Sequence, residues 1–212
     1  MPTKIRLLTG SFVKYSKTNN LMSKNDGLKI AVGISGASGS IYAKVILQQL
    51  KNAGEQVQSV GVVWSKNAKE VWQYELPNEP IPNGFLTWEN DNFSAPIASG
   101  SAQWDALIIC PCSMGTLGRV ANGLSDTLLT RAADVQLKER RKLICVLRET
   151  PYNLLQIQNM ERLTQSGGII CPASPSFYSL PKTFEALAAT VTGRALALCG
   201  IDVPSFQWGK TN

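Results

Sequence analysis

The chain has 212 residues, of which 44% are hydrophobic and 17% charged, which is ordinary for one globular domain with a buried core. The formal net charge is +6, but most of the excess lies in the first 29 residues; a nucleic-acid partner needs basic residues clustered on a folded face, so none is expected. Histidine is absent, which excludes Ser-His-Asp and Cys-His catalysis and leaves proton transfer to Glu, Asp, Lys, Tyr or the substrate.

The N-terminal segment differs in character from the rest of the chain. Residues 1–28 are basic and lack periodic apolar positions, so we expect a basic, disordered extension followed by one domain over 29–212. The same composition fits an organellar transit peptide, and Met22 is an alternative start. Nowhere do 18 consecutive apolar residues occur. The sequence therefore predicts a cytoplasmic protein without a membrane partner, with an organelle stroma or matrix as the alternative.

The cysteines are expected to be buried, reduced thiols. They form no CxxC pair and mostly lie in apolar runs, at Cys110, Cys112, Cys145, Cys171 and Cys199. An odd number of apolar cysteines fits a reducing compartment better than disulfides or a zinc site. We therefore expect no metal.

Short β-rich runs alternate with longer helical runs along the chain. We expect strands at 29–34, 57–64, 106–110, 142–147 and 167–172, and helices at 40–52, 66–75, 113–121, 125–140, 153–166 and 182–198. This alternation predicts an α/β fold, a three-layer, doubly wound parallel sheet in one flavodoxin-like or Rossmann-like domain. Residues 77–103, which contain four prolines, are expected to form a long functional loop.

Three strand ends carry residues suited to a ligand. The first strand runs into Gly33-Ile-Ser-Gly36-Ala-Ser-Gly39-Ser40, whose small residues open a helix and favour an anion such as a phosphate. The spacing differs from the GxGxxG dinucleotide fingerprint, so a mononucleotide fits better than NAD, with a plain tight turn as the alternative. The second strand ends at Ser65, a helix cap or a ligand contact, and the third at Cys110-Pro-Cys112-Ser113-Met-Gly115-Thr116. All three ends are expected to face one crevice.

Two charged groups follow. Arg131, Asp134 and Lys138 project from one helical face, either as a solvated face on which Asp134 pairs with both neighbours or as an anion site. Arg148 and Glu149 stand at another carboxyl strand end, where open α/β sheets place their ligands. The position of this second pair favours a site.

Several of these motifs, in this order, resemble the UbiX flavin prenyltransferases. They are GISGASGS, WSKNAKEVWQYE, SGS, CPCSMGTL, RAADVQLKERR, RETP and PSFYSLP, and the match covers roughly residues 29–208. The resemblance implies transfer of a dimethylallyl group from dimethylallyl phosphate to N5, and then C6, of reduced FMN without a metal. The product, prenylated FMN, would serve UbiD-type decarboxylases. The resemblance also implies a trimer-based homo-oligomer, usually a dodecamer, with each site at a subunit junction.

The resemblance assigns roles residue by residue. It implies flavin contacts from Gly36, Ala37, Ser38, Ser65, Cys112, Ser113, Met114, Gly115 and Arg148. The prenyl phosphate would be bound by Arg131, Lys138, Tyr178 and Arg194, and Trp208 would help to close the site. Catalytic roles would fall to Ser38, Glu75, Lys138 and Glu149. This sequence has Phe93 on the long loop where other members carry Trp, and Phe is the weaker π donor.

Two other functions are compatible with a flavin fold. The flavin-dependent cysteine decarboxylases share the fold but use a catalytic histidine, which this chain lacks. A non-catalytic flavin-storage protein would need only the flavin turns and has no use for Arg131, Lys138, Glu149, Tyr178 and Arg194. Their joint presence favours catalysis.

Overall fold

The structure is a computed structural model that describes residues 27–204 and 209. Its centre is a sheet of six parallel strands in the spatial order β3-β2-β1-β4-β5-β6. The strands are β1 (Leu28–Ile34), β2 (Val57–Trp64), β3 (Leu86–Glu89), β4 (Ala106–Cys112), β5 (Lys142–Leu147) and β6 (Ile169–Pro172). This is the Rossmann-type order, in which the direction of winding reverses between β1 and β4.

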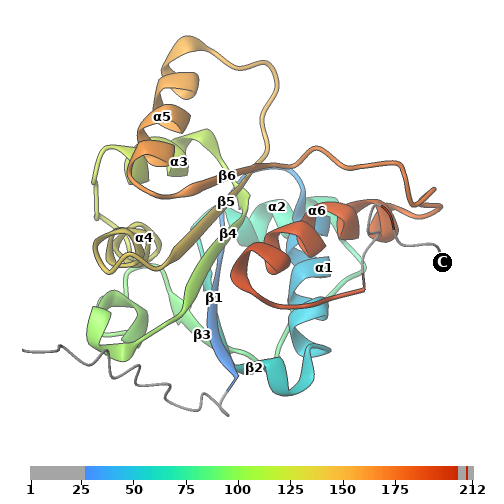
Figure 1. Cartoon of the computed structure of the whole chain (residues 1–212), viewed down its shortest axis with the longest axis horizontal. Helices are drawn as coiled ribbons and strands as arrows, with labels where there is room; N and C mark the ends of the chain where they lie inside the picture. Colours follow the sequence, from blue (N-terminus) through green and yellow to red (C-terminus); the bar gives the residue numbers. More distant parts are fainter. Residues whose placement is uncertain (1–26, 205–208, 210–212) are drawn as a thin grey trace, which may run out of the picture.

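Helices cover both faces of this sheet, which gives the three predicted layers (Figure 1). One face carries α1 (Ser40–Lys51), α2 (Ala68–Glu75) and α6 (Phe184–Cys199); the other carries α3 (Met114–Ala121), α4 (Leu128–Lys138) and α5 (Leu154–Gln165). Successive residues of β1 feed the two cores in turn, Ile30 toward α1 and Ala31 toward α4. Because both faces are covered, every residue of β4 is buried. The predicted α/β fold is confirmed.

The proline-rich segment 77–103, predicted as one long functional loop, contains regular structure. It contains the edge strand β3, which pairs with β2, and two short 3-10 helices at Pro96–Ala98 and Gly100–Ala102. Trp88 of β3 packs edge-on against Trp104, with ring centroids 5.6 Å apart. The strand has only four residues, mostly exposed, so the prolines around it dominate the sequence pattern.

Side-chain caps begin most of the helices. Thr127 and Asn153 form capping boxes at α4 and α5. At α1 the N-cap residue is Gly39, in the left-handed conformation with φ 116° and without a side-chain cap. Ser65 was predicted as a possible cap of the second helix, but α2 begins only at Ala68. That prediction is wrong, because two turn residues separate Ser65 from the helix.

The first strand of the described residues lies beside the boundary that the sequence predicts between the extension and the domain. β1 starts at Leu28, and the backbone N–H of Lys29 donates to the Asp105 carboxylate at 2.9 Å. Most of the predicted N-terminal extension, residues 1–26, lies outside the described residues. In the part of the chain that is described, no helix has the length and apolar character needed to cross a membrane.

Gly61 of β2 tests the packing of β3 on the sheet. A Cβ atom there would collide with the Trp88 ring and lie 2.9 Å from the Trp104 ring. Overpacking of this kind lowers the free energy of unfolding by about 1–3 kcal/mol. For a chain of this size, each kcal/mol lost lowers the melting temperature by about 2–4 °C. We expect Gly61→Ala to lower the melting temperature by several degrees, measured by circular dichroism.

Gly118→Ala in α3 is the matched control. Its new Cβ would lie 3.4 Å from the Asn159 side chain, an ordinary contact, and Ala favours a helix over Gly. This variant should melt at or above the temperature of the unchanged protein. Equal melting temperatures for the two variants would contradict the packing account.

Candidate active site

The carboxyl ends of β1, β2 and β4 meet around one cavity of about 300 Å³. Four residues that the resemblance assigns to the flavin line it: Gly36, Ser65, Ser113 and Gly115. They come from three separate strand-to-helix turns, at the point where the strand order reverses and open α/β sheets bind their ligands. The structure thus brings the three predicted turns into one crevice.

The amino end of α1 already holds an anion, the carboxylate of Glu75. The N–H groups of Gly39 and Ser40 donate to it at 2.9 and 2.6 Å. Burial raises the pKa of Glu75, but hydrogen bonds from the Ser38 side chain and from these N–H groups outweigh it and hold the pKa below its ordinary value. Glu75 is therefore ionised at neutral pH and occupies the position that the sequence favours for a phosphate.

The first turn is tightly packed. A Cβ atom on Gly36 would lie 2.7 Å from the Asn67 side chain, so only glycine fits there without a shift. Ala37 is buried at 8% exposure, whereas Ser38 is exposed. Ala37 supports the turn from inside, and a ligand would meet Gly36 and Ser38.

The third turn offers fewer side chains than the sequence suggests. Ser113 caps α3 by accepting the N–H of Thr116 at 3.3 Å, and Met114 is 8% exposed. Cys112 is fully buried; its hydrogen bond with Cys145, and then burial, raise the pKa of its thiol well above the usual value. The Cys112 side chain therefore packs behind the turn, and Ser113, Gly115 and Thr116 line the cavity.

Arg148 and Glu149 follow β5 at the same edge of the sheet. The Arg148 backbone N–H donates to the Cys112 carbonyl at 3.2 Å, and its side chain lies beside Gly39 of the first turn. The Glu149 carboxylate accepts the N–H of Thr150 at 2.9 Å. Within the described ranges no ion pair joins Arg148 to Glu149, so the carboxylate is not held as a structural partner of that arginine.

The residues assigned to the prenyl phosphate are divided between the two faces of the sheet. Arg131 and Lys138 belong to α4, whereas Arg194 belongs to α6 on the opposite face and Tyr178 to the segment that leads into α6 (Figure 1). Trp208 lies outside the described residues. A single chain does not bring this set together.

The charged face of α4 is only partly paired as predicted. The Arg131 Nη1 pairs with Asp134 at 2.9 Å, and its Nε donates to the Ala98 carbonyl at 3.2 Å. Lys138 instead pairs with its neighbour Glu139 at 2.5 Å, so Asp134 does not bridge both cations. The second bond of Arg131 ties the proline-rich segment to α4.

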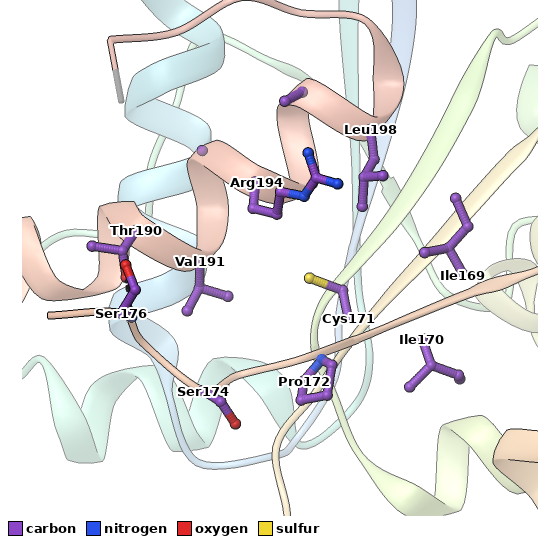
Figure 2. A pocket seen from close by; sticks show the side chains of 12 residues that line it. Ile169, Ile170, Cys171, Pro172, Ser174, Ser176, Thr190, Val191, Arg194 and Leu198 are labelled. Carbon is purple, nitrogen blue, oxygen red and sulfur yellow. Dashed lines mark hydrogen bonds between the residues drawn. The ribbon is translucent and has the colours of Figure 1, made fainter. Parts of the chain in front are cut away.

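Arg194 lies at a second and larger cavity, of about 860 Å³, between β6 and α6 (Figure 2). Its guanidinium extends toward the side chain of Leu198, Cys171 lies across the cavity on β6, and Ser176 and Thr190 line the other end. Burial raises the pKa of the Cys171 thiol, and the charge of Arg194 only partly offsets this. Because β6 is an edge strand, this cavity flanks the sheet and is separate from the three turns.

Sequence reasoning gave no individual role to several residues that line the smaller cavity: Lys66, Asn67, Asn90, Arg119 and also Thr116, although Thr116 stands in the third predicted turn. Lys66 adjoins Ser65, and Thr116 stands three positions after Ser113, so their neighbours gave a usable signal. Asn90 belongs to the segment 77–103 that was expected to be functional, but nothing in the sequence distinguished it from its neighbours; it accepts the N–H of Leu129 at 3.0 Å.

Cations, hydroxyls and carboxylates are the chemical groups that lie at the carboxyl edge of the sheet. Lys66 brings positive charge to the smaller cavity, where Arg119 pairs with the Asp126 carboxylate at 3.2 Å. Glu75 and Glu149 bring further carboxylates to the same edge of the sheet. Across residues 27–204, no group of three or more His, Cys, Asp or Glu side chains could hold a metal ion. This set suits binding of a phosphorylated ligand and transfer of a proton by a carboxylate.

Comparison with known proteins decides the family. The Flavoprotein family model matches residues 18–193. The flavin prenyltransferase UbiX of Methanocaldococcus jannaschii is 43% identical over 186 residues, 86% of this chain and 99% of the relative. That of Thermoplasma acidophilum is 45% identical over 82% of this chain and 96% of the relative. The chain belongs to the UbiX flavin prenyltransferase family.

Solved structures agree with this placement in the UbiX family. AnUbiX, in complex with FMN and dimethylallyl pyrophosphate, matches with TM-score 0.81 and 33% identity over 88% of this chain and all of the other. A dodecameric FMN-dependent UbiX-like decarboxylase from Escherichia coli O157:H7 matches with TM-score 0.79 and 34% identity, over 86% of this chain and all of the other. The cysteine decarboxylase SpaF, at 0.54 and 19% over 76% of this chain and 97% of the other, shares the fold alone. The enzyme class is therefore prenyl transfer to a flavin, as the sequence motifs predicted.

Glu75→Gln tests the anion at α1. A carboxylate whose folded pKa is lowered stabilises the protein above its ordinary pKa of 4.5, and this stability is lost as pH falls through the folded value. We expect the variant to melt about 2–4 °C lower at pH 7, as for loss of a helix cap. The difference in melting temperature between Glu75→Gln and the unchanged protein should narrow as the pH falls below 4.5.

Glu70→Gln is the control, because it makes the same charge change on an exposed residue of the same helix. Its melting temperature should follow that of the unchanged protein at every pH. If the melting temperature of Glu75→Gln stays below that of the unchanged protein by the same amount from neutral to acid pH, Glu75 is not ionised as described.

Proposed function

We propose that the protein transfers a dimethylallyl group from dimethylallyl phosphate to N5 of reduced FMN, closes a ring to C6, and delivers the product to a UbiD-type decarboxylase. One observation carries the proposal: the turns after β1, β2 and β4 share one cavity that combines hydroxyls with the cation Lys66 and with Arg119, whose Nε pairs with Asp126 at 3.2 Å. The complex of AnUbiX with FMN and dimethylallyl pyrophosphate, a structural relative of this chain, supports it.

The position of Glu75 supports a particular place for the flavin phosphate. The α1 N–H groups of Gly39 and Ser40 are taken by that carboxylate, and a second anion beside it would be repelled. The amino end of α3 is the alternative, since it presents Ser113, Gly115 and Thr116 to the cavity and helix amino ends favour phosphate. The residues present therefore fit FMN, with its phosphate at α3 and its ring toward Ser38 and Arg148.

The reaction needs an anion site for a leaving group and an acceptor for a proton. The C–O bond of the prenyl phosphate breaks with its electron pair on phosphate, while the N5 lone pair forms the new C–N bond and the N5 proton leaves. Arg131, Lys138, Tyr178 and Arg194 would stabilise the departing phosphate, an electrostatic effect worth several kcal/mol in a dry site. Ser38, Glu75 and Glu149 are the groups proposed to handle the proton.

The division of the phosphate-binding residues supports a site made by more than one copy of the chain. Arg131 lies on α4 and Arg194 on α6, with the sheet between them, so neither can reach the phosphate bound by the other within one chain. Apolar side chains at the same edge, Leu154, Leu155 and Phe177, are 67–70% exposed. We infer a trimer-based homo-oligomer, and the dodecameric relative from E. coli supports it.

The state of the thiols supports a reducing compartment. All five cysteines are free, and four of them are buried. Burial, with a smaller contribution from Cys171, raises the pKa of Cys110 well above its usual range. Burial also raises the pKa of Cys199 to about 12, although Lys142 opposes it, and both thiols are therefore unreactive. We propose the cytoplasm as the location.

The direct test is incubation with reduced FMN and a prenyl donor under anaerobic conditions. Dimethylallyl phosphate and dimethylallyl diphosphate are supplied separately, and the flavin is analysed by mass spectrometry for an added five-carbon unit. We expect addition with the monophosphate. Oxidised FMN is the control, because its N5 has no proton to exchange for an alkyl group. Absence of the adduct with both donors would overturn the proposed function.

Glu149→Gln tests the proton-handling role. The change keeps the size and hydrogen bonding of the side chain but removes its ionisable proton. FMN should still bind, while turnover should fall by about 10²–10⁴, the usual share of a positioned acid or base. FMN affinity and prenylation rate are measured on the same variant.

Glu161→Gln, an exposed carboxylate of α5, serves as the control and should leave both quantities unchanged. Full turnover by Glu149→Gln would remove Glu149 from the catalytic set. A loss explained wholly by weaker FMN binding would instead give it a binding role.

A further inference from the structure

Ser35, which lies in the GISGASGS motif but was given no role of its own, joins the first and third turns from inside the protein. Its hydroxyl donates to the Pro111 carbonyl at 2.8 Å and accepts the N–H of Ser113 at 2.8 Å. Its own backbone N–H also donates to the Pro111 carbonyl, at 3.2 Å. The residue is 2% exposed, so these bonds are shielded from water.

The sheet cannot provide these bonds itself. Pro111 has no N–H to give to a neighbouring strand, and the pairing of β4 with β5 shifts register between Ile109 and Cys112. The N–H of Ser113, just beyond this irregularity, would lack a partner in the strand ladder. A buried N–H without a partner is unfavourable, and the Ser35 hydroxyl supplies one.

The contact also decides which donors the third turn offers. The N–H of Ser113 is used by Ser35, and the N–H of Thr116 by the Ser113 side chain. Among the described residues, none accepts from the N–H groups of Met114 and Gly115. These two donors stand in the first turn of α3, where an anion is favoured.

We propose that Ser35 is a positioning residue for flavin binding: it sets the distance between the first and third turns and directs the Met114 and Gly115 N–H groups at the flavin phosphate. This rests on the proposed function, which places the phosphate at α3. Ser35 itself does not touch the ligand, since it is buried beneath the turns.

Ser35→Ala removes both side-chain bonds and leaves the Ser113 N–H without a partner. The dissociation constant of FMN, measured by isothermal titration calorimetry, should rise about tenfold or more. The KM for dimethylallyl phosphate at saturating FMN should stay unchanged, because the prenyl phosphate is bound by other residues. Ser35→Thr keeps the hydroxyl and should restore most of the FMN affinity.

Thr192→Val is the matched control. Thr192 is a fully buried hydroxyl of α6 that donates to the Ala188 carbonyl at 3.3 Å, away from the turns. Its removal should lower the melting temperature without changing FMN affinity. A structural role alone for Ser35 predicts the same behaviour for Ser35→Ala.

Each outcome decides between these roles. FMN affinity of Ser35→Ala equal to that of the unchanged protein would overturn the inference and leave the proposed function intact. If the unchanged protein does not bind FMN, the proposed function fails and the inference with it. If Ser35→Ala does not fold, Ser35→Cys fills the space with a weaker hydrogen-bonding group; it should bind FMN more weakly, and unaltered affinity would refute the proposal.

Discussion

The carboxylate of Glu75 at the amino end of α1 is the contact on which the rest of the site depends. Glu75 is the last residue of α2, and its carboxylate accepts hydrogen bonds from the N–H groups of Gly39 and Ser40. These bonds hold the end of α2 against the turn that follows β1. Because this internal anion uses the donors of α1, the positive end of α3 is left for a ligand. In the proposed function, this carboxylate thus directs the flavin phosphate to α3.

Coverage of the sheet on both faces has a second consequence. It allows strands that are apolar throughout, but it also separates α4 from α6 and therefore Arg131 from Arg194. A phosphate that needs both cations requires a second copy of the chain. Large apolar side chains near the strand ends, such as Leu154 and Phe177, are exposed, as contact with a second copy would require. In the proposed oligomer, the layer structure links catalysis to assembly.

The absence of histidine fits chemistry that depends on charge placement. Departure of a phosphate is assisted by fixed cations, which do not have to exchange protons at neutral pH. Proton transfer then falls to carboxylates, and the two at this edge differ. Glu75 is held ionised by four donors from one turn, whereas Glu149 accepts only the adjacent N–H of Thr150 in the described structure. The less constrained carboxylate has the greater freedom to take up and release a proton.

The sequence by itself determined the layer architecture, because apolar runs buried on two faces and helical periods are local signals. It also determined the turns at Gly36, Ser65 and Ser113, since their small and hydroxylated residues directly follow the strands. The tertiary structure decided the rest: the β3 strand, the anion at α1, the separation of Arg131 from Arg194, and the bridge made by Ser35. These depend on contacts between residues that are 25 to 78 positions apart in the chain, or on which side of the sheet a helix lies. No local pattern carries that information.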